Sequence, residues 1–357
     1  MNSPHVYSIA VIPGDGIGTE VIPEGLRVLE RLAEQSAGQY QFAWETYPWG
    51  CQYYLDTGRM MDEDGLVRLS GADAIYFGAV GWPGVPDHIS LWGLRLAICQ
   101  GFDQYACVRP VRLLPGVPSP LRDATPERID WVVVRENSEG EYAGIGGRNL
   151  AARGADREVA VQTALFTAQG CERIIRYAFD LARTRRRKVT SVTKSNAQQY
   201  AMVLWDETFD RVRQEYPDVA TEQWLVDAMA ARFVLRPETL DVVVASNLFG
   251  DILSDLGSAI GGSLGIAASA NLDPERRFPS MFEPVHGSAP DIAGRGIANP
   301  IAAIWTAALM LDHLGLTAEA ARVMRAIEET TAAGVVTPDL GGTATTRQVG
   351  AAILKRL

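Results

Sequence analysis

Two aspartates four residues apart, Asp251 and Asp255, have the spacing in this sequence that points most directly to chemistry. On a helix this spacing places both carboxylates on one face, where they repel each other unless a cation lies between them. The residues around them are mostly apolar: Leu248, Phe249, Ile252, Leu253 and Leu256. A divalent hard cation such as Mg²⁺ or Mn²⁺ would resolve the repulsion, because it prefers carboxylate oxygen ligands. On spacing alone, a charged helix face near a positive helix end explains the pair equally well.

The residues before this pair predict how it is positioned. Residues 240–246 form a valine-rich apolar run, which predicts a buried strand, and Asn247 fits the N-cap of the following helix. Two other predicted strands also end in polar residues, namely Arg135, with Tyr142 in the turn beyond it, and Lys194. Because α/β proteins bind ligands at the carboxyl ends of strands, we expect these residues at a site, although Lys194 alone also fits an ordinary exposed lysine.

Two glycine-containing loops are candidates for cofactor contacts. Residues 282–291 combine glycine, proline and short polar side chains, so their backbone amides could approach a phosphate, and Asp291 could accept ribose hydroxyls. Gly14, Gly16 and Gly18 resemble half of a dinucleotide fingerprint. Their spacing is G-x-G-x-G, however, and no acidic residue closes a second strand about 20 residues further on. We therefore interpret this segment as a turn between the first strand and the first helix.

Composition places the chain among globular proteins and excludes several partners. Its 357 residues are 47% apolar, which is enough to bury a large core and to form two domains. A net charge of −10 argues against nucleic acid and anionic membranes as partners. The sequence contains no apolar run of about 20 residues and no signal-peptide pattern, so we expect a cytoplasmic protein. The four cysteines lack metal-site spacing, which suits reduced thiols in that compartment.

The order of predicted elements indicates an α/β fold with a largely parallel central sheet. Strands are predicted over residues 7–13, 42–47, 72–78, 128–135, 188–193 and 240–246. Helices are predicted over residues 19–35 and 62–69, and the final hundred residues are predicted to be helical over 299–314, 317–333 and 346–357. No internal repeat or low-complexity linker separates domains, so any two domains must be interleaved or closely docked.

Four motifs together resemble the β-decarboxylating dehydrogenases of isocitrate and isopropylmalate. They lie at residues 12–20, 134–142, 247–257 and 283–291, in the family's order along nearly the whole chain. This resemblance implies two interleaved α/β domains around a large mixed sheet rather than a Rossmann domain. The larger, cofactor-side domain would comprise residues 1–104 and 262–357. The smaller domain, residues 105–261, would carry a homodimer interface and a clasp arm at about 144–160.

Within this family the sequence is most similar to the tartrate and D-malate dehydrogenase branch. The similarity is carried by the segments 77–83, 85–92, 102–105 and 109–112. It implies oxidation, with β-decarboxylation, of a small 2-hydroxy acid by an enzyme that depends on NAD and on Mg²⁺ or Mn²⁺. The alternatives are 3-isopropylmalate dehydrogenase, a related dehydrogenase with a novel substrate, and a non-catalytic nucleotide-binding subunit. The presence of all the expected catalytic residues argues against the last of these.

The resemblance also implies roles for individual residues. Asp251 and Asp255 would bind the metal together with Asp227 from the partner subunit of a homodimer with shared active sites. Lys194, also contributed across the dimer, would handle the proton of the substrate hydroxyl, and Tyr142 would protonate the product carbon. Arginines Arg109 and Arg135 would clamp the carboxylate that is lost. The NAD contacts would be Asp291, His286, Gly287, Ser288, Ala289, Asn299, Asn196 and Gly262.

One position departs from the family pattern. The first substrate arginine is expected ten residues before Arg109, where this chain has Cys99. An arginine, Arg95, occurs four residues earlier, one helical turn away, where isopropylmalate dehydrogenases place a leucine. Our hypothesis is that Arg95 replaces the missing clamp and favours a polar substituent on the substrate. The alternative is that Arg95 points to solvent and the site has a different substrate.

Overall fold

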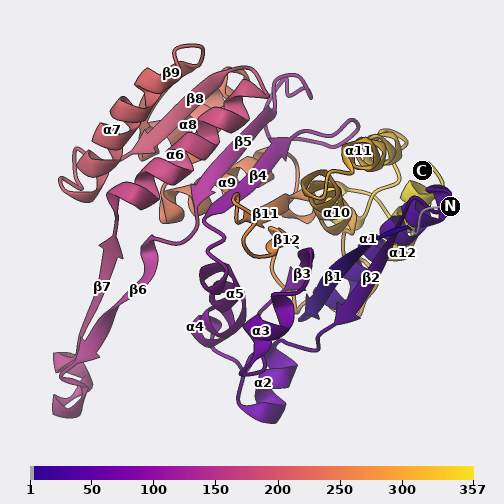
Figure 1. The fold of residues 1–357 in the computed structure, drawn as a ribbon, viewed down its shortest axis with the longest axis horizontal. Helices are drawn as coiled ribbons and strands as arrows, with labels where there is room; N and C mark the ends of the chain where they lie inside the picture. Colours follow the sequence, from indigo (N-terminus) through magenta and orange to yellow (C-terminus); the bar gives the residue numbers. More distant parts are fainter. Residues whose placement is uncertain (1–3) are drawn as a thin grey trace. The chain divides into compact units, whose positions relative to one another are not determined.

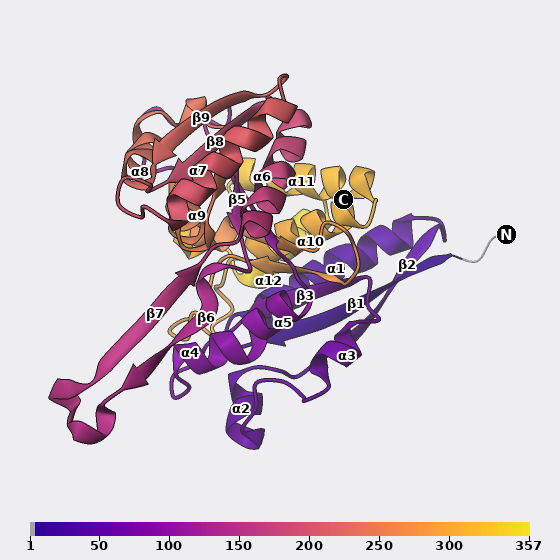
Figure 2. The same ribbon diagram turned by 60° about the vertical axis from the view of Figure 1, so that its left-hand side comes forward.

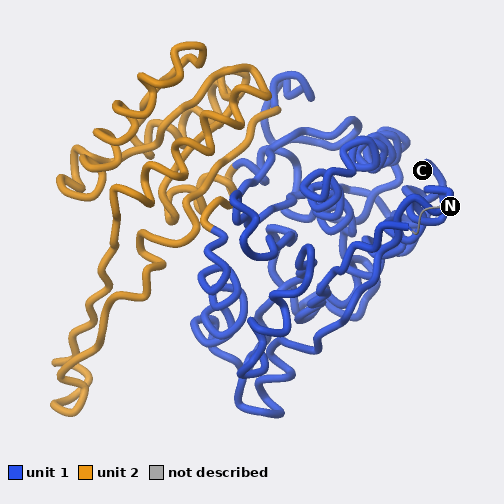
Figure 3. The backbone as a smooth tube through the Cα atoms, in the orientation of Figure 1, with its two compact units in different colours: residues 1–104, 108–129, 257–357 blue, residues 105–107, 130–256 orange. Residues whose placement is uncertain are grey.

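The computed structural model describes residues 4–357, which fall into two compact units (Figure 3). The first comprises the described residues up to Gln104 together with 108–129 and 257–357. The second comprises 105–107 and 130–256. Each unit combines helices with strands, which confirms the predicted α/β class (Figure 1).

The first unit is built on a mixed sheet. Its strands, in spatial order, are β2 (Tyr40–Thr46), β1 (His5–Gly14), β3 (Ala74–Ala79), β12 (Ser280–Pro284), β11 (Ala268–Leu272) and β4 (Ala106–Arg112), of which residues 108–112 belong to this unit. Strand β1 pairs in parallel with β2 and β3, and β12 pairs in parallel with β3, but β11 runs antiparallel to β12. Its helices are α1 (Gly18–Gln35), α2 (Cys51–Thr57), α3 (Gly65–Leu69), α4 (Asp87–Ser90), α5 (Leu96–Gly101), α10 (Ile301–His313), α11 (Thr317–Ala332) and α12 (Thr346–Leu354).

Alternation along the strands gives this sheet two buried faces. On one face, Ala10, Ile12 and Phe77 belong to an apolar cluster. The same cluster includes Trp49, Leu94 and Phe102. On the opposite face, the hydroxyl of Tyr76 donates a hydrogen bond to the carbonyl of Ala303 in α10, at 2.7 Å. A strand buried on both faces reads as a continuous apolar run, which is why β3 is buried along its whole length.

Helix α10 is apolar on nearly all sides, and its packing explains why. It contacts α1, α11 and the strands β11 and β12, so nearly all its residues are buried. A helix that is apolar all round must be enclosed in this way. At 13 residues it is a core helix, and no helix among residues 4–357 is both long enough and apolar enough to span a bilayer.

The second unit contains a four-stranded parallel sheet. Its strands lie in the order β5 (Asp130–Glu136), β10 (Val242–Ala245), β8 (Lys188–Thr193) and β9 (Ala220–Leu225), and every pairing is parallel. Helix α6 (Ala168–Arg183) contacts the three strands β5, β8 and β10, and α7 (Ala201–Val212) packs beside it. Helix α8 (Val226–Leu235) follows β9, and α9 (Asn247–Ile260), whose residues up to Leu256 belong to this unit, follows β10.

A long hairpin leaves the body of the second unit (Figure 2). It consists of β6 (Gly140–Asn149) and β7 (Val159–Leu165), which form an antiparallel pair separate from the main sheet. Six of the seven residues of β7 are exposed, among them Val159, Val161 and Leu165. Among residues 4–357, no hydrophobic core covers the exposed apolar side chains of this ribbon.

Most predicted elements exist, and the differences have local causes. The strand predicted over 188–193 has those bounds in the structure, and the helix predicted over 317–333 ends one residue earlier. The strands β11 and β12, which precede the three helices predicted in the final hundred residues, were not predicted. Strand β12 contains Glu283 and ends at Pro284, so it does not show the apolar pattern by which a buried strand is recognised.

His313 at the end of α10 should make stability depend on pH. Burial, and then the charge of Arg276, lower the pKa of His313 to about 4, and its ring packs on Phe282 with centroids 5.4 Å apart. The unfolded chain takes up this proton near pH 6.5, so this contribution to stability is complete above pH 6.5 and is lost as pH falls toward 4. Thermal unfolding of His313→Gln between pH 7 and 4 should show a shallower fall in Tm than the wild type. Equal slopes for the two proteins would contradict this assignment.

Candidate active site

Four predicted site residues lie along one edge of the second unit's sheet. Arg135 lies in β5, and Asp251 lies in α9, which follows β10. Lys194 follows β8, and Asp227 lies in the first turn of α8 after β9. Because all four strands are parallel, their carboxyl ends share one edge. This is the edge at which open α/β sheets bind ligands.

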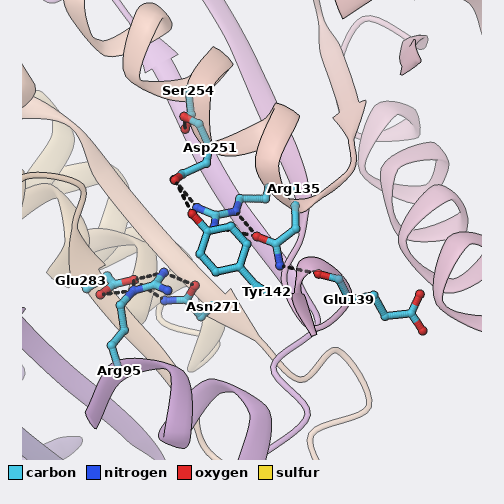
Figure 4. A network of polar contacts seen from close by, with 9 residues as sticks. Arg95, Arg135, Glu139, Tyr142, Asp251, Ser254, Asn271 and Glu283 are labelled. Atoms are coloured by element: carbon cyan, nitrogen blue, oxygen red, sulfur yellow. Dashed lines mark hydrogen bonds and ion pairs between the residues drawn. The ribbon is translucent and has the colours of Figure 1, made fainter. Parts of the chain in front are cut away.

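Asp251, Arg135 and Tyr142 form a polar cluster at this edge (Figure 4). The Arg135 guanidinium, 2% exposed, makes an ion pair with Asp251 through Nη1. The Tyr142 hydroxyl lies 3.1 Å from the other carboxylate oxygen of Asp251 and can donate a hydrogen bond to it. The guanidinium also lies over the Tyr142 ring, 5.2 Å from its centroid. The structure therefore brings together a predicted metal ligand, a predicted carboxylate clamp and a predicted acid.

Asn247 orients this cluster, a role that the sequence analysis missed. Its side-chain oxygen accepts hydrogen bonds from Nε and Nη2 of Arg135, at 2.9 and 2.6 Å, and its amide donates to the Glu139 carbonyl at 3.1 Å. The prediction that Asn247 caps a helix is wrong, because α9 begins at Asn247 itself and its side chain binds Arg135. A buried guanidinium carries five donors, which demand acceptors. The signal in the sequence was a polar residue ending a buried strand.

The acidic residues after Arg135 build the turn that carries Tyr142. The buried Glu136 carboxylate accepts hydrogen bonds from the backbone amides of Ser138 and Glu139, at 2.9 and 2.7 Å. Glu139 in turn accepts from the amide of Thr167, at 2.9 Å. These carboxylates fix the loop, so their role is to position other groups.

Lys194 and Asp227 form a second pair at the same edge. Lys194 Nζ lies 2.5 Å from Asp227 Oδ1, and the hydrogen bond from Lys194 is the main cause that lowers the pKa of Asp227. Asp227 is therefore a carboxylate at neutral pH. Lys194 and Asp227 belong to the same chain and are paired with each other. Any ligand that Asp227 contacts will therefore also lie close to Lys194.

The carboxylates of α9 suit a hard cation. Asp251 and Asp255 lie one turn apart in the helix, and Asp255 is exposed. Their oxygen donors match the preference of Mg²⁺ and Mn²⁺. Within residues 4–357 no three histidine, cysteine or acidic side chains of one chain come together as a metal cluster. Asp227 of the same chain lies with Lys194 instead.

In the first unit, Arg95 is buried in a polar network. Its side chain is 10% exposed and pairs with Glu283, with Nη2 and Oε1 2.6 Å apart (Figure 4). The alternative that Arg95 points to solvent is therefore wrong. Cys99, 1% exposed, belongs to the apolar cluster that includes Leu94 and Phe77, which explains how a small apolar side chain is accommodated there.

The predicted cofactor loop contacts the glycine turn after β1. The amide of Ile17 donates to the Ser288 carbonyl at 2.9 Å, and Asp15 accepts hydrogen bonds from the amides of Cys51 and Gly81, at 2.7 and 2.9 Å. The turn is thus a packing element that holds neighbouring loops, as the weak fingerprint indicated. Ala289 in the same loop has a positive φ of 41°, a conformation that non-glycine residues rarely adopt.

His286 has the properties of a nucleotide contact. Its Nδ1 lies 2.9 Å from the Gly287 carbonyl, which can only accept, so Nδ1 carries the proton. Burial lowers the pKa of His286, which keeps the ring neutral, and its buried Nε2 has no hydrogen-bond partner. A ligand with an amino group would satisfy this acceptor. A Cβ placed on Gly287 would meet nothing within 4 Å, so space is open beside the loop.

Four other predicted cofactor residues have identifiable contacts or positions. The Asn299 side chain accepts from the amide of Ile301 and donates to Asp339, both at 3.0 Å, so it organises the start of α10. Gly262, with φ of 118°, lies where a Cβ would come within 2.4 Å of Val117. Asn196 is exposed in the turn after β8 of the second unit, and Asp291 is exposed beside the 286–289 loop.

Gly16→Ala should weaken cofactor binding, although Gly16 is not itself a proposed cofactor-binding residue. Gly16 has φ of 52°, and a Cβ there would lie 2.1 Å from the Ser288 carbonyl, so the loop must shift. We expect the KM for the nucleotide cofactor to rise by about tenfold or more, equivalent to ~1.4 kcal/mol of binding free energy. Gly71→Ala, where a Cβ meets nothing within 4 Å, is the matched control. Unchanged cofactor kinetics in a folded Gly16→Ala protein would refute the role of this contact.

Comparison with known proteins identifies the family. The model of the isocitrate/isopropylmalate dehydrogenase family matches residues 8–353. The chain is 61% identical over 348 residues to the probable tartrate dehydrogenase/decarboxylase TtuC of Agrobacterium vitis, covering 97% of this chain and 95% of that protein. It is 55% identical over 355 residues to the D-malate dehydrogenase [decarboxylating] of Escherichia coli (strain K12), covering 97% of each chain.

A solved structure agrees with the fold. The crystal structure of isocitrate dehydrogenase from Methylococcus capsulatus superposes with a TM-score of 0.87 at 37% identity, covering 98% of this chain and 99% of that one. This confirms the isocitrate dehydrogenase-like fold, and with it the prediction that the glycine turn does not mark a Rossmann domain. The chain belongs to the isocitrate/isopropylmalate dehydrogenase family.

Proposed function

We propose that the protein is a dehydrogenase that uses NAD and a divalent metal ion to oxidise and decarboxylate a small 2-hydroxy acid, tartrate or D-malate. The observation that carries the proposal is the cluster in which Asp251 contacts both Arg135 and Tyr142. Relatives at more than half identity over nearly the full length, named for tartrate and D-malate, give the substrate class.

The proposed metal ligands are Asp251 and Asp255 with Asp227 of a second copy of the chain. The exposed Asp255 and the carboxylate character of Asp227 support this set. A bound Mg²⁺ or Mn²⁺ would polarise the substrate hydroxyl and stabilise the negative charge that develops as carbon dioxide leaves. The positive charge of such an ion would offset the repulsion between the carboxylates of Asp251 and Asp255.

The remaining residues orient the substrate and move protons. Arg109 and Arg135 bind the carboxylate that is lost, because a planar guanidinium suits two carboxylate oxygens. Lys194, delivered with Asp227 from the second copy, accepts the hydroxyl proton, and Tyr142 donates a proton to the carbon that carbon dioxide leaves. The contact between Tyr142 and Asp251 supports this placement of the acid beside the metal ligands.

The proposed cofactor is NAD, bound at the 286–291 loop. The unpartnered Nε2 of His286 suits the amino group of adenine, and the exposed Asp291 carboxylate suits the two ribose hydroxyls. A carboxylate at this position would repel the 2′-phosphate of NADP. Asn196 is proposed to contact the nicotinamide side.

The proposed assembly is a homodimer whose interface lies on the second unit. The hairpin β6–β7 exposes Ile145, Val159 and Val161, with exposed fractions of 44%, 49% and 57%. Such apolar side chains on an extended ribbon suit a clasp that pairs with the same hairpin of another copy. This assembly would deliver Lys194 and Asp227 to the neighbouring site.

The experiment that tests the function is a substrate panel. Absorbance of NADH is followed with NAD and Mn²⁺ against D-malate, the stereoisomers of tartrate, 3-isopropylmalate and isocitrate, with NADP as a parallel cofactor. We expect turnover of D-malate or a tartrate, with NAD preferred. Turnover of 3-isopropylmalate alone would establish the runner-up activity. A folded, NAD-binding protein that is silent across the panel would instead indicate a novel substrate or a non-catalytic subunit.

A further inference from the structure

We infer that Glu283 and Asn271 are positioning residues for Arg95, and that this buried triad, rather than Arg95 alone, determines the preference for a polar over an apolar substituent on the substrate. The inference rests on the proposed function and names the residues that give its site specificity. All three residues lie in the first unit, and Figure 4 shows them as one network of dashed contacts.

The local structure around Arg95 holds it inside the protein. Residues Leu91–Arg95 form a π-helical turn between α4 and α5. Such wider turns are rare in proteins overall, and those that occur often lie at functional sites. The flanking side chains of Leu94 and Leu96 are 0% and 1% exposed. An arginine in such surroundings requires a charged partner, since an isolated buried charge strongly destabilises the folded state.

Strands β11 and β12 supply that partner. Glu283 follows the fully buried Met281 and Phe282, so an acid enters an otherwise apolar strand. Ser269 is the direct neighbour of Glu283 across the antiparallel pair, which places Asn271 two residues along, on the same face. Two adjacent strands therefore present an acceptor and an amide toward Arg95.

The contacts fix the plane of the guanidinium. Arg95 Nε lies 2.8 and 3.1 Å from the two carboxylate oxygens of Glu283, and Nη2 lies 2.6 Å from Oε1. Nη2 also donates to the Asn271 oxygen at 3.3 Å, and the Asn271 amide donates to Glu283 at 2.7 Å. Each residue thus binds the other two. The Nε–Nη2 edge is held by the protein, and the guanidinium cannot turn without breaking several hydrogen bonds.

Charge links this triad to the proposed carboxylate clamp. Burial alone would raise the pKa of Glu283, but the charge and hydrogen bonds of Arg95, the hydrogen bond from Asn271 and the charge of Arg109 hold it below its usual range. Glu283 is therefore ionised beside two arginines. Arg95 thus belongs to the same electrostatic group as the proposed substrate residue Arg109.

The test is a double-mutant cycle with two independent readouts. The variants are Arg95→Leu, Glu283→Gln and the combination of both, with Asn271→Ala as a milder change to the same triad. Glu24→Gln is the matched control, because Glu24 is another buried acid of the first unit that pairs with an arginine, Arg27. Each protein is measured for Tm and for the ratio of kcat/KM with its best hydroxy acid to kcat/KM with 3-isopropylmalate.

We expect each single substitution at Arg95 or Glu283 to lower the Tm by about 5 °C or more, because it strands the other charge, and the double variant to recover most of the loss. Glu283→Gln should lower the specificity ratio about tenfold, chiefly through KM, although it leaves Arg95 in place. Arg95→Leu should lower the ratio at least as far, and the double variant no further. Asn271→Ala should move the ratio in the same direction by less.

Three results would overturn the inference. The first is an unchanged ratio in Glu283→Gln when Arg95→Leu changes it, and the second is an equal change in Glu24→Gln. The third is additive losses of Tm, which would mean that the two charges are not coupled. If the wild type turns over none of the hydroxy acids, the proposed function fails and this inference falls with it. Wild-type turnover with an unmoved ratio refutes this inference alone.

Discussion

Asp251→Asn should abolish dehydrogenation almost completely, with a fall in kcat of about 10³-fold or more. The substitution keeps the size of the side chain and removes its charge. It weakens the proposed metal site, and it also removes the ionic partner of Arg135 and alters the contact of Tyr142. One change therefore disturbs three proposed functions of the site at once.

The measurements are kcat, Mn²⁺ affinity by calorimetry and the free energy of unfolding. Arg135 is buried and would lose its ion pair with Asp251, so we expect a destabilisation of about 3 kcal/mol as well as weaker metal binding. Asp180→Asn, at an exposed side chain of α6, is the control for loss of an aspartate charge in the same unit. Near-normal turnover in Asp251→Asn would contradict the metal assignment.

Lys194→Ala should reduce kcat by about 10²- to 10⁴-fold, the usual range for loss of a general base. Lys194→Arg should not restore activity, because a guanidinium stays protonated and cannot accept the hydroxyl proton. The pKa of Asp227 should rise in Lys194→Ala, since the hydrogen bond from Lys194 is its main lowering cause. The measurements are single-turnover rates and the NMR titration of Asp227 in both proteins.

Mixing two inactive proteins separates a shared site from a site within one chain. In hybrids of Lys194→Ala with Asp251→Ala, one of the two sites receives an intact Lys194 from one chain and an intact Asp251 from the other. An equal mixture after complete exchange should recover about a quarter of wild-type activity, because half of the dimers are hybrids with one good site each. No recovery after confirmed subunit exchange would show that Lys194 acts within its own chain.

The candidate residues could be chosen from the sequence, whereas their contacts could not. The spacing of Asp251 and Asp255 and the strand before them predicted a helix that presents two carboxylates, and α9 does so. Nothing in local spacing predicts that Asn247 binds Arg135, 112 residues away, because that contact depends on the parallel register of β5 and β10. The N-cap prediction for Asn247 failed for this reason, since a tertiary partner outweighed a local one.

Arg95 shows the same limit more clearly. The sequence shows an arginine one helical turn from Cys99. From the sequence alone, either solvent or substrate could have bound its guanidinium. Its partner, Glu283, lies 188 residues further on, in a strand that apolar periodicity did not predict. A signal existed nonetheless, because an acid between Phe282 and Pro284 in an apolar segment is expected to pair with a cation once the segment is buried.

Oxidation coupled to decarboxylation is tested most directly by measuring NADH and carbon dioxide together. The wild-type protein is incubated with NAD, Mn²⁺ and D-malate, or with the tartrate stereoisomer that turns over best in the panel. With D-malate we expect one carbon dioxide for each NADH. Removing the metal with a chelator should stop formation of both products, and adding the metal back should restore it. A folded protein that binds NAD but forms no NADH from either acid, or that forms NADH equally well without metal, would contradict the proposed function.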